Sequence, residues 1–183
     1  WAAAVAKDLK DAGKGAVVVA GYSQPPAVHA LAAAINSVLG AVGSTVTLVQ
    51  PTEPVALGIQ ELTASLSAGK VSTLVILGGN PAYNAPVDLQ FEAVAKKAGT
   101  VIRLGYYEDE TAALATWHLA GTHFLESWGD ARTADGTVVP VQPLVEPLFG
   151  GLTELEVLAR LLGESKVSPY DIVRETLKGL GAT

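Results

Sequence analysis

Short apolar runs alternate with segments of helical periodicity along the first two thirds of this chain. Four runs rich in β-branched residues are short enough for strands that are buried on both faces. They lie at residues 16–20, 45–49, 71–77 and 100–104. Helical segments, most of them ending near a glycine, lie at 1–10, 27–39, 55–67 and 87–97. A β-loop-α unit that repeats in this way predicts a doubly wound, mainly parallel sheet with helices on both faces, a Rossmann-like α/β fold.

The pattern changes after residue 104. A polar turn at 106–110 is followed by a short helix at 111–114 and a short strand at 117–120. From 122 to 149 the glycines and prolines predict a long irregular segment, which is uncommon unless it is functional or covers something. Two C-terminal helices follow the irregular segment. They are expected at 153–162 and 169–180, with Thr153 and Ser168 as N-caps.

The composition is apolar for one domain. Of the 183 residues, 49% are hydrophobic and 16% are charged, whereas a soluble domain carries about 25% charged residues. No apolar run reaches the roughly 18 residues that span a bilayer. The excess therefore predicts additional buried surface, in a thick α/β core, against a permanent partner, or both.

Charge and cysteine content exclude several classes of function. The net charge of −6, without a basic cluster, argues against a nucleic-acid partner. The absence of cysteine excludes a disulfide, a thiolate nucleophile and an iron–sulfur ligand set within this chain. The chain begins at Trp1 and contains no methionine. We therefore expect a single domain over 1–183 that is a processed chain or a piece of a larger subunit.

The apolar run at 71–77 ends in Gly78, Gly79, Asn80 and Pro81. In an open parallel sheet, ligands bind beyond the carboxyl ends of the strands, so this loop is the first candidate site. Its glycines would let backbone N–H groups approach a phosphate or nucleotide that the Asn80 side chain orients. A tight strand exit would need the same small residues, and the sequence favours neither alternative. No GxGxxG or P-loop pattern accompanies the loop.

Four residues in the irregular region have side chains that can bind metals or transfer protons: His118, His123, Glu126 and Asp130. Their spacing matches no compact zinc motif, and aromatic residues are interleaved with them. A packed turn with hydrogen-bonded histidines is therefore favoured over a metal site. His29, inside an apolar helical segment, is expected to be a satisfied core residue.

Glu108, Asp109 and Glu110 form the remaining acidic cluster. Paired carboxylates can serve as acid and base, but three acids in one turn are more often solvated charge. Glu110 before a short helix also suits helix-start electrostatics. No activated serine or triad pattern accompanies them, so we expect no catalytic residues in this chain.

Several loop motifs together resemble the molybdopterin oxidoreductase family. That family has a GxNP strand end, an ETA turn, an E-x-x-G loop and a QP-x-x-x-P segment, all in this order. The corresponding residues are 77–81, 107–112, 124–130 and 142–147. Residues 24–31, 36–43 and 117–119 sharpen the likeness to the molybdopterin-oxidoreductase-like iron–sulfur subunit of alternative complex III, the bacterial quinol:cytochrome c oxidoreductase. The resemblance covers nearly the whole chain.

This resemblance implies a redox-silent structural domain within a peripheral iron–sulfur subunit of a membrane respiratory complex. The domain would position cofactor-bearing neighbours: an iron–sulfur domain, cytochrome c subunits and a membrane quinol subunit. The resemblance places it on the periplasmic side of the bacterial inner membrane. Iron–sulfur clusters and haem would belong to the parent complex, with no cofactor in this chain and no membrane span of its own.

Two alternatives remain open from the sequence. In catalytic members of the family, the corresponding domain helps to hold a molybdopterin guanine dinucleotide, and Gly78, Gly79 and Asn80 would lie on that crevice. In the alternative complex III subunit the crevice is expected to be vestigial. The second alternative is a free-standing module that binds a nucleotide or another small molecule.

Overall fold

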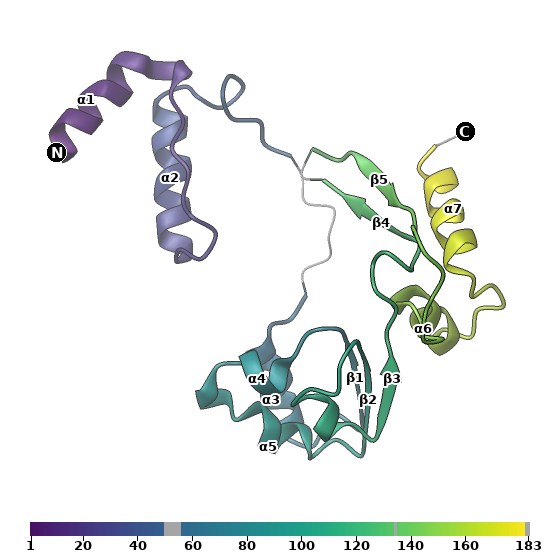
Figure 1. Ribbon diagram of the computed structural model, residues 1–183. Coiled ribbons are helices and arrows are strands. Elements are labelled where there is room, and N and C mark those ends of the chain that lie inside the picture. Colours follow the sequence, from purple (N-terminus) through teal and green to yellow (C-terminus); the bar gives the residue numbers. More distant parts are fainter. Residues whose placement is uncertain (50–55, 134, 182–183) are drawn as a thin grey trace. The chain divides into compact units, whose positions relative to one another are not determined.

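The computed structural model describes residues 1–49, 56–133 and 135–181. These residues form two compact units, Trp1–Pro54 and Val55–Thr183, which are described separately (Figure 1). Among the described residues, no helix is both long and apolar enough to cross a membrane.

The first unit contains two α-helices, α1 (Ala2–Ala12) and α2 (Pro26–Val38), with a short 3₁₀ helix, η1 (Gly13–Gly15), after α1. Both α-helices were predicted within a few residues of these bounds. Pro26 occupies the first position of α2, where its missing N–H costs no intrahelical bond. The only buried residue of α2 is Asn36, and His29 is exposed. The prediction of a core histidine at position 29 is therefore wrong in this unit.

The two predicted strands of this unit are not strands in the structure. Residues 16–20 belong to no strand, and the backbone of Val18 is bonded to a side chain instead of a neighbouring strand. The Asn36 amide accepts from the Val18 N–H and donates to the Val18 carbonyl, at 2.8 Å each. Residues 45–49 contribute only an isolated bridge between Val42 and Val46. Apolar β-branched sequence creates a strand only where a partner backbone pairs with it.

The second unit is built on a three-stranded parallel sheet in the order β1-β2-β3 (Figure 1). Its strands are β1 (Thr73–Leu77), β2 (Thr100–Gly105) and β3 (Trp117–Ala120). The register joins Leu74 to Val101 and Arg103 to His118. All three strands were predicted, and the mixed α/β class with a parallel sheet is confirmed.

One face of this sheet carries the hydrophobic core. Alternate residues of β1 and β2 pack against helices α3 (Ile59–Ser67) and α5 (Phe91–Ala95), which Figure 1 shows on the same side of the sheet. The buried cluster consists of Leu66, Leu74, Ile76, Phe91, Ala95 and Val101. Short helical turns complete the connections: α4 (Pro81–Asn84), η2 (Val87–Leu89) and η3 (Ala112–Leu114). On the opposite face, Val75 and Ile102 are only half-buried.

The predicted irregular region contains an antiparallel hairpin, β4 (Gly129–Arg132) and β5 (Val138–Val141). Its turn includes Asp135 and Gly136, and Gly136 has a φ of 90°. Asp-Gly between β-branched residues is a hairpin signal that the prediction missed. Proline is accommodated at position 140 because β5 pairs with β4 on one side. On its other side the strand needs no backbone N–H for pairing.

Two helices close the chain, α6 (Glu154–Leu161) and α7 (Pro169–Gly179). Both predicted N-caps are confirmed. The Thr153 hydroxyl accepts from the Glu156 N–H at 3.0 Å, and the Glu156 carboxylate accepts from the Thr153 N–H at 2.9 Å. This reciprocal pair is a capping box, and it fixes where α6 begins.

Candidate functional site

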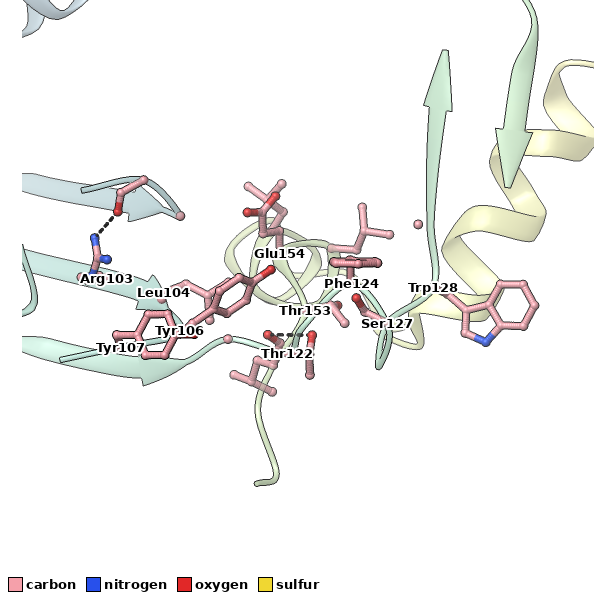
Figure 2. A pocket seen from close by; sticks show the side chains of 18 of the residues that line it. Arg103, Leu104, Tyr106, Tyr107, Thr122, Phe124, Ser127, Trp128, Thr153 and Glu154 are labelled. Atoms are coloured by element: carbon pink, nitrogen blue, oxygen red, sulfur yellow. Dashed lines mark hydrogen bonds between the residues drawn. The ribbon is translucent and has the colours of Figure 1, made fainter. Parts of the chain in front are cut away.

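A cavity of about 650 Å³ lies at the carboxyl ends of the three parallel strands. The loops after β1, β2 and β3 and the beginning of α6 all contribute to its wall (Figure 2). Gly78, Gly79 and Asn80 are among its lining residues. The loop singled out in the sequence therefore borders a cavity at this end of the sheet, where ligands of open α/β sheets bind.

The two glycines of this loop are required by its backbone. Gly78 and Gly79 have φ values of 66° and 67°, in the left-handed region that favours glycine. The Gly78 N–H donates to the Leu104 carbonyl at 2.9 Å, which extends the β1–β2 pairing by one bond. A Cβ on Gly78 would lie 3.3 Å from a carboxylate oxygen of Glu154. The turn and the close approach of α6 together account for glycine at position 78.

Both the oxygen and the nitrogen of the Asn80 amide are hydrogen-bonded within the protein. Its oxygen accepts from the Thr111 hydroxyl at 2.6 Å, and its NH₂ group donates to the Glu110 carboxylate at 2.7 Å. Thr111 is completely buried, and its hydroxyl also accepts from the Ala82 N–H at 3.0 Å. These bonds join the loop after β1 to the loop after β2, and we call them the Asn80 clamp. The Asn80 side chain is thus used as a structural link.

Arg103 makes a second link between the same two loops. Its guanidinium donates to the Gly79 carbonyl at 2.8 Å and to the Asp109 carboxylate at 2.5 Å. The side chains of Arg103 and Asp109 are 3% and 20% exposed. The other Asp109 oxygen accepts from the N–H groups of Thr111 and Ala112, and so holds the turn at η3. Asp109 is therefore a structural residue, and only in part the solvated charge that was predicted.

Arg103 was missed in the sequence because it lies inside an apolar run. The available signal was a single cation within a strand, followed by three acids in the next loop. A buried arginine needs a paired carboxylate, and Asp109 supplies it. The alternation of β2 places Arg103 on the same face as the core residue Val101, at the end of the strand where the cavity begins.

Two buried polar atoms near the sheet have no hydrogen-bond partner among the described residues: Arg103 Nε and His118 Nδ1. They belong to residues that are paired in the β2–β3 register, so both side chains start from the same face of the sheet. Arg103 lines the cavity. A buried N–H of a charged group without an acceptor is costly, and it is a natural place for a water or a ligand oxygen.

The charge around the cavity is predominantly negative. Its lining contains one cationic side chain, Arg103, and three carboxylates, Asp109, Asp130 and Glu154, for a formal sum of −2 (one minus three). Asp109 is paired with Arg103, whereas Asp130 and Glu154 are exposed. A free anion would therefore meet net repulsion in this cavity.

The four candidate metal ligands are not brought together. His118 lies on β3, and Asp130 lies on β4. His123 Nδ1 accepts from the Leu125 N–H at 3.3 Å, and Glu126 accepts from the N–H groups of His123 and Leu148. Within the described ranges, no group of three or more His, Cys, Asp or Glu side chains is placed to hold a metal ion. The predicted hydrogen bond is confirmed for His123, but this residue is exposed and not packed, and the buried Nδ1 of His118 has no partner among the described residues.

Two carboxylates of this region have a lowered pKa. Hydrogen bonds from the backbone N–H groups of His123 and Leu148 lower the pKa of Glu126. The pKa of Glu110 is lowered first by the hydrogen bond from the Asn80 side chain and then by a backbone N–H. In both cases the donors favour the ionised form.

The Asn80 clamp predicts a measurable titration. We expect the Glu110 carboxyl, followed by NMR, to titrate below the usual glutamate value of about 4.3, and its pKa to rise in Asn80→Ala, which removes the largest cause of the shift. Because the pKa of Glu110 is lowered in the folded state, this residue contributes its full stabilisation at pH values above its pKa in the unfolded chain. That contribution is lost as the pH falls through the folded pKa. Asn84→Ala, an exposed asparagine on α4, is the matched control. An unchanged Glu110 titration in Asn80→Ala would contradict the clamp.

Two comparisons with known proteins yield no match. A scan of protein-family models finds none that fits this chain, and a search of curated proteins finds no similar sequence. The resemblance to molybdopterin oxidoreductases therefore stays a prediction from the loop motifs.

Proposed function

We propose that this chain is a redox-silent structural domain of the iron–sulfur subunit of a quinol:cytochrome c oxidoreductase, alternative complex III. In this role it holds the iron–sulfur domain, the cytochrome c subunits and the membrane quinol subunit in place, on the periplasmic side of the membrane. The iron–sulfur clusters and haem of the complex lie in those neighbours. Electron transfer needs cofactors at constant separations, and a rigid domain supplies that geometry.

This proposal is based on the hydrogen bonds that the loops after β1 and β2 make with each other. The oxygen and the NH₂ group of Asn80 are bonded to Thr111 and Glu110, and the Gly79 carbonyl is bonded to Arg103. A loop that oriented a nucleotide through Asn80 would need to leave that amide available. The two links instead make the loops after β1 and β2 a single rigid unit, as a scaffold requires.

The electrostatics of the loop support the same conclusion. The phosphate interpretation needs backbone N–H groups that face an anion. Here the Glu154 carboxylate lies against Gly78, and the Glu110 carboxylate is bonded to Asn80. Two carboxylates beside the loop would repel a pyrophosphate, so these residues fit the phosphates of a molybdopterin guanine dinucleotide poorly.

A second candidate function remains, the binding of that dinucleotide in a catalytic molybdenum oxidoreductase. The cavity favours it, because about 650 Å³ at the strand ends is large enough for a substantial ligand. Tyr106 and Tyr107 on its lining would supply aromatic faces to such a ligand. A nucleotide or small-molecule module that acts alone would use the same two features.

The test that separates these functions is chemical analysis of the native assembly that contains this chain. Molybdenum and tungsten are measured, and acid oxidation releases any pterin as a fluorescent product. For the structural domain we expect iron and haem, without pterin. Pterin and metal at about one per chain would establish the catalytic alternative instead.

We further propose that the complete fold is doubly wound, with residues 16–20 and 45–49 as additional parallel strands. Their β-branched apolar sequence and the half-buried side chains of Val75 and Ile102 support this. The expected result is slow amide hydrogen exchange at residues 16–20, comparable to that of β1. Exchange of Val17 and Val19 as fast as in an open loop would contradict it.

A further inference from the structure

Four aromatic rings form a continuous row beside the cavity: Tyr107, Tyr106, His123 and Phe124. Successive ring centroids are 6.3, 5.8 and 4.3 Å apart. Tyr106, Tyr107 and Phe124 line the cavity, and they are 57%, 76% and 59% exposed. In Figure 2, Phe124 lies between the two tyrosines at the end of β2 and Trp128. We call these residues the aromatic row. Exposed rings in a row are typical of a surface that binds another molecule.

Carboxylates border the aromatic row. Glu154 lies between the strand ends and Phe124 in Figure 2, and Asp130 lines the same cavity from β4. Among the described residues, neither carboxylate takes part in an ion pair with a lysine or arginine. Aromatic faces and carboxylates both attract cations, and an arginine guanidinium can stack on the first while it binds the second.

Arg103 does not offset this negative charge. It belongs to the lining of the cavity, but it is 2% exposed and is paired with Asp109. The site therefore offers aromatic faces along its walls and negative charge at its border. An occupant should carry flat or ring-shaped apolar groups and positive charge.

We propose that the cavity binds an extended, basic, proline-containing segment of a neighbouring polypeptide. A polyproline II segment is already extended, so little conformational entropy is lost when it lies along the aromatic row. Proline rings pack on aromatic rows of this kind, and arginine side chains of the segment would reach Asp130 and Glu154. This inference rests on the proposed function, because it names the chemistry by which the scaffold holds a neighbour.

The test uses the 183-residue chain and a short synthetic peptide in which single arginines alternate with proline pairs. Calorimetric titration should show saturable binding. Replacing arginine by glutamate in the peptide should abolish the binding, because the net charge of the cavity is negative. Replacing proline by glycine should weaken it, because a flexible peptide loses more entropy when it is ordered.

Protein variants locate the peptide in the cavity. Tyr107→Ala should weaken binding about fivefold, whereas Tyr83→Ala, an equally exposed tyrosine outside this cavity, should not change it. The double variant Asp130→Asn, Glu154→Gln should weaken it about fivefold at low salt and less at high salt. The double variant Glu146→Gln, Glu164→Gln, at two exposed carboxylates outside this cavity, is the matched control for charge. Equal effects of Tyr107→Ala and Tyr83→Ala would overturn the proposal, and so would equal affinity for the acidic peptide.

The competing occupant is tested in the same titration. Saturable binding of guanosine monophosphate, without binding of the basic peptide, would also overturn the proposal. The result is independent of the pterin analysis of the native assembly. Absence of peptide binding with absence of pterin would end the docking proposal and leave the structural role intact.

Discussion

Replacing Asp109 by alanine is expected to lower the free energy of unfolding by about 3 kcal/mol. The substitution leaves the Arg103 guanidinium, whose side chain is 3% exposed, without its carboxylate partner. Removing one member of a buried pair is more costly than removing both, because the remaining charge stays desolvated. The value is at the lower end of the usual range because the Asp109 side chain is 20% exposed. Urea denaturation measures it.

Two further variants separate the charge from the turn. Asp109→Asn keeps an oxygen for the N–H groups of Thr111 and Ala112 but removes the charge, so it isolates the contribution of the ion pair. The double variant Arg103→Met, Asp109→Ala should recover much of the loss, since no unpaired charge remains. If the double variant is as unstable as the sum of the single variants, the two side chains are not coupled and the second link is wrong.

Gly151→Ala is expected to destabilise the chain by about 2 kcal/mol. A Cβ at position 151 would lie 3.0 Å from the backbone carbon of Gly121 and 3.1 Å from the Ala120 carbonyl oxygen. Both atoms belong to the backbone at the end of β3, where Leu152 N–H donates to the Ala120 carbonyl at 2.9 Å. Backbone atoms cannot rotate away as a side chain can. The segment that leads into α6 must therefore move away from the end of β3.

Gly179→Ala is the control for Gly151→Ala. A Cβ there meets nothing within 4 Å, and the residue lies in α7. Alanine is the better helix former, so we expect this change to be neutral or slightly stabilising. Thermal unfolding of the two variants gives the comparison. If Gly151→Ala is as stable as Gly179→Ala, the close approach between residue 151 and the end of β3 does not exist in solution.

Both variants test the framework around the cavity. Asp109 and Arg103 hold the loops after β1 and β2 together, and Gly151 lets the chain that leads into α6 approach β3. The positions of Tyr106 and Glu154 depend on these two features. Peptide binding should therefore weaken in any variant that loosens the framework, which is why exposed residues such as Tyr107 are the sharper test of the docking proposal.

The sequence predicts most secondary structure of the second unit because local periodicity and packing agree there. It correctly predicted the strands at 73–77 and 100–105 and the N-caps Thr153 and Ser168. The hairpin at 129–141 was missed although Asp135 and Gly136 signal its turn, because both strands are short, β4 is polar and β5 contains a proline. Residues 16–20 show the converse, since an apolar run is a strand only when another backbone pairs with it.

The candidate site was predicted by position but not by its contacts. Gly78, Gly79 and Asn80 were identified from the abrupt end of an apolar run, and they line the cavity. No local pattern predicts the hydrogen bonds of Asn80 with Thr111 and Glu110, which lie about thirty positions away. Arg103 was missed because its partner, Asp109, lies in the next loop and is not indicated by the apolar strand pattern.

By itself, then, the sequence determined the parallel α/β class, the strand that leads to the candidate loop, and the need for glycine at its end. These features follow from hydrophobic periodicity and backbone sterics, which act between near neighbours. Only the tertiary structure decided what the polar residues do: it paired Arg103 with Asp109, closed Asn80 against Glu110, and placed Tyr106, Phe124 and Glu154 around one cavity. Such contacts join distant segments, because the carboxyl ends of parallel strands meet only after the sheet has formed.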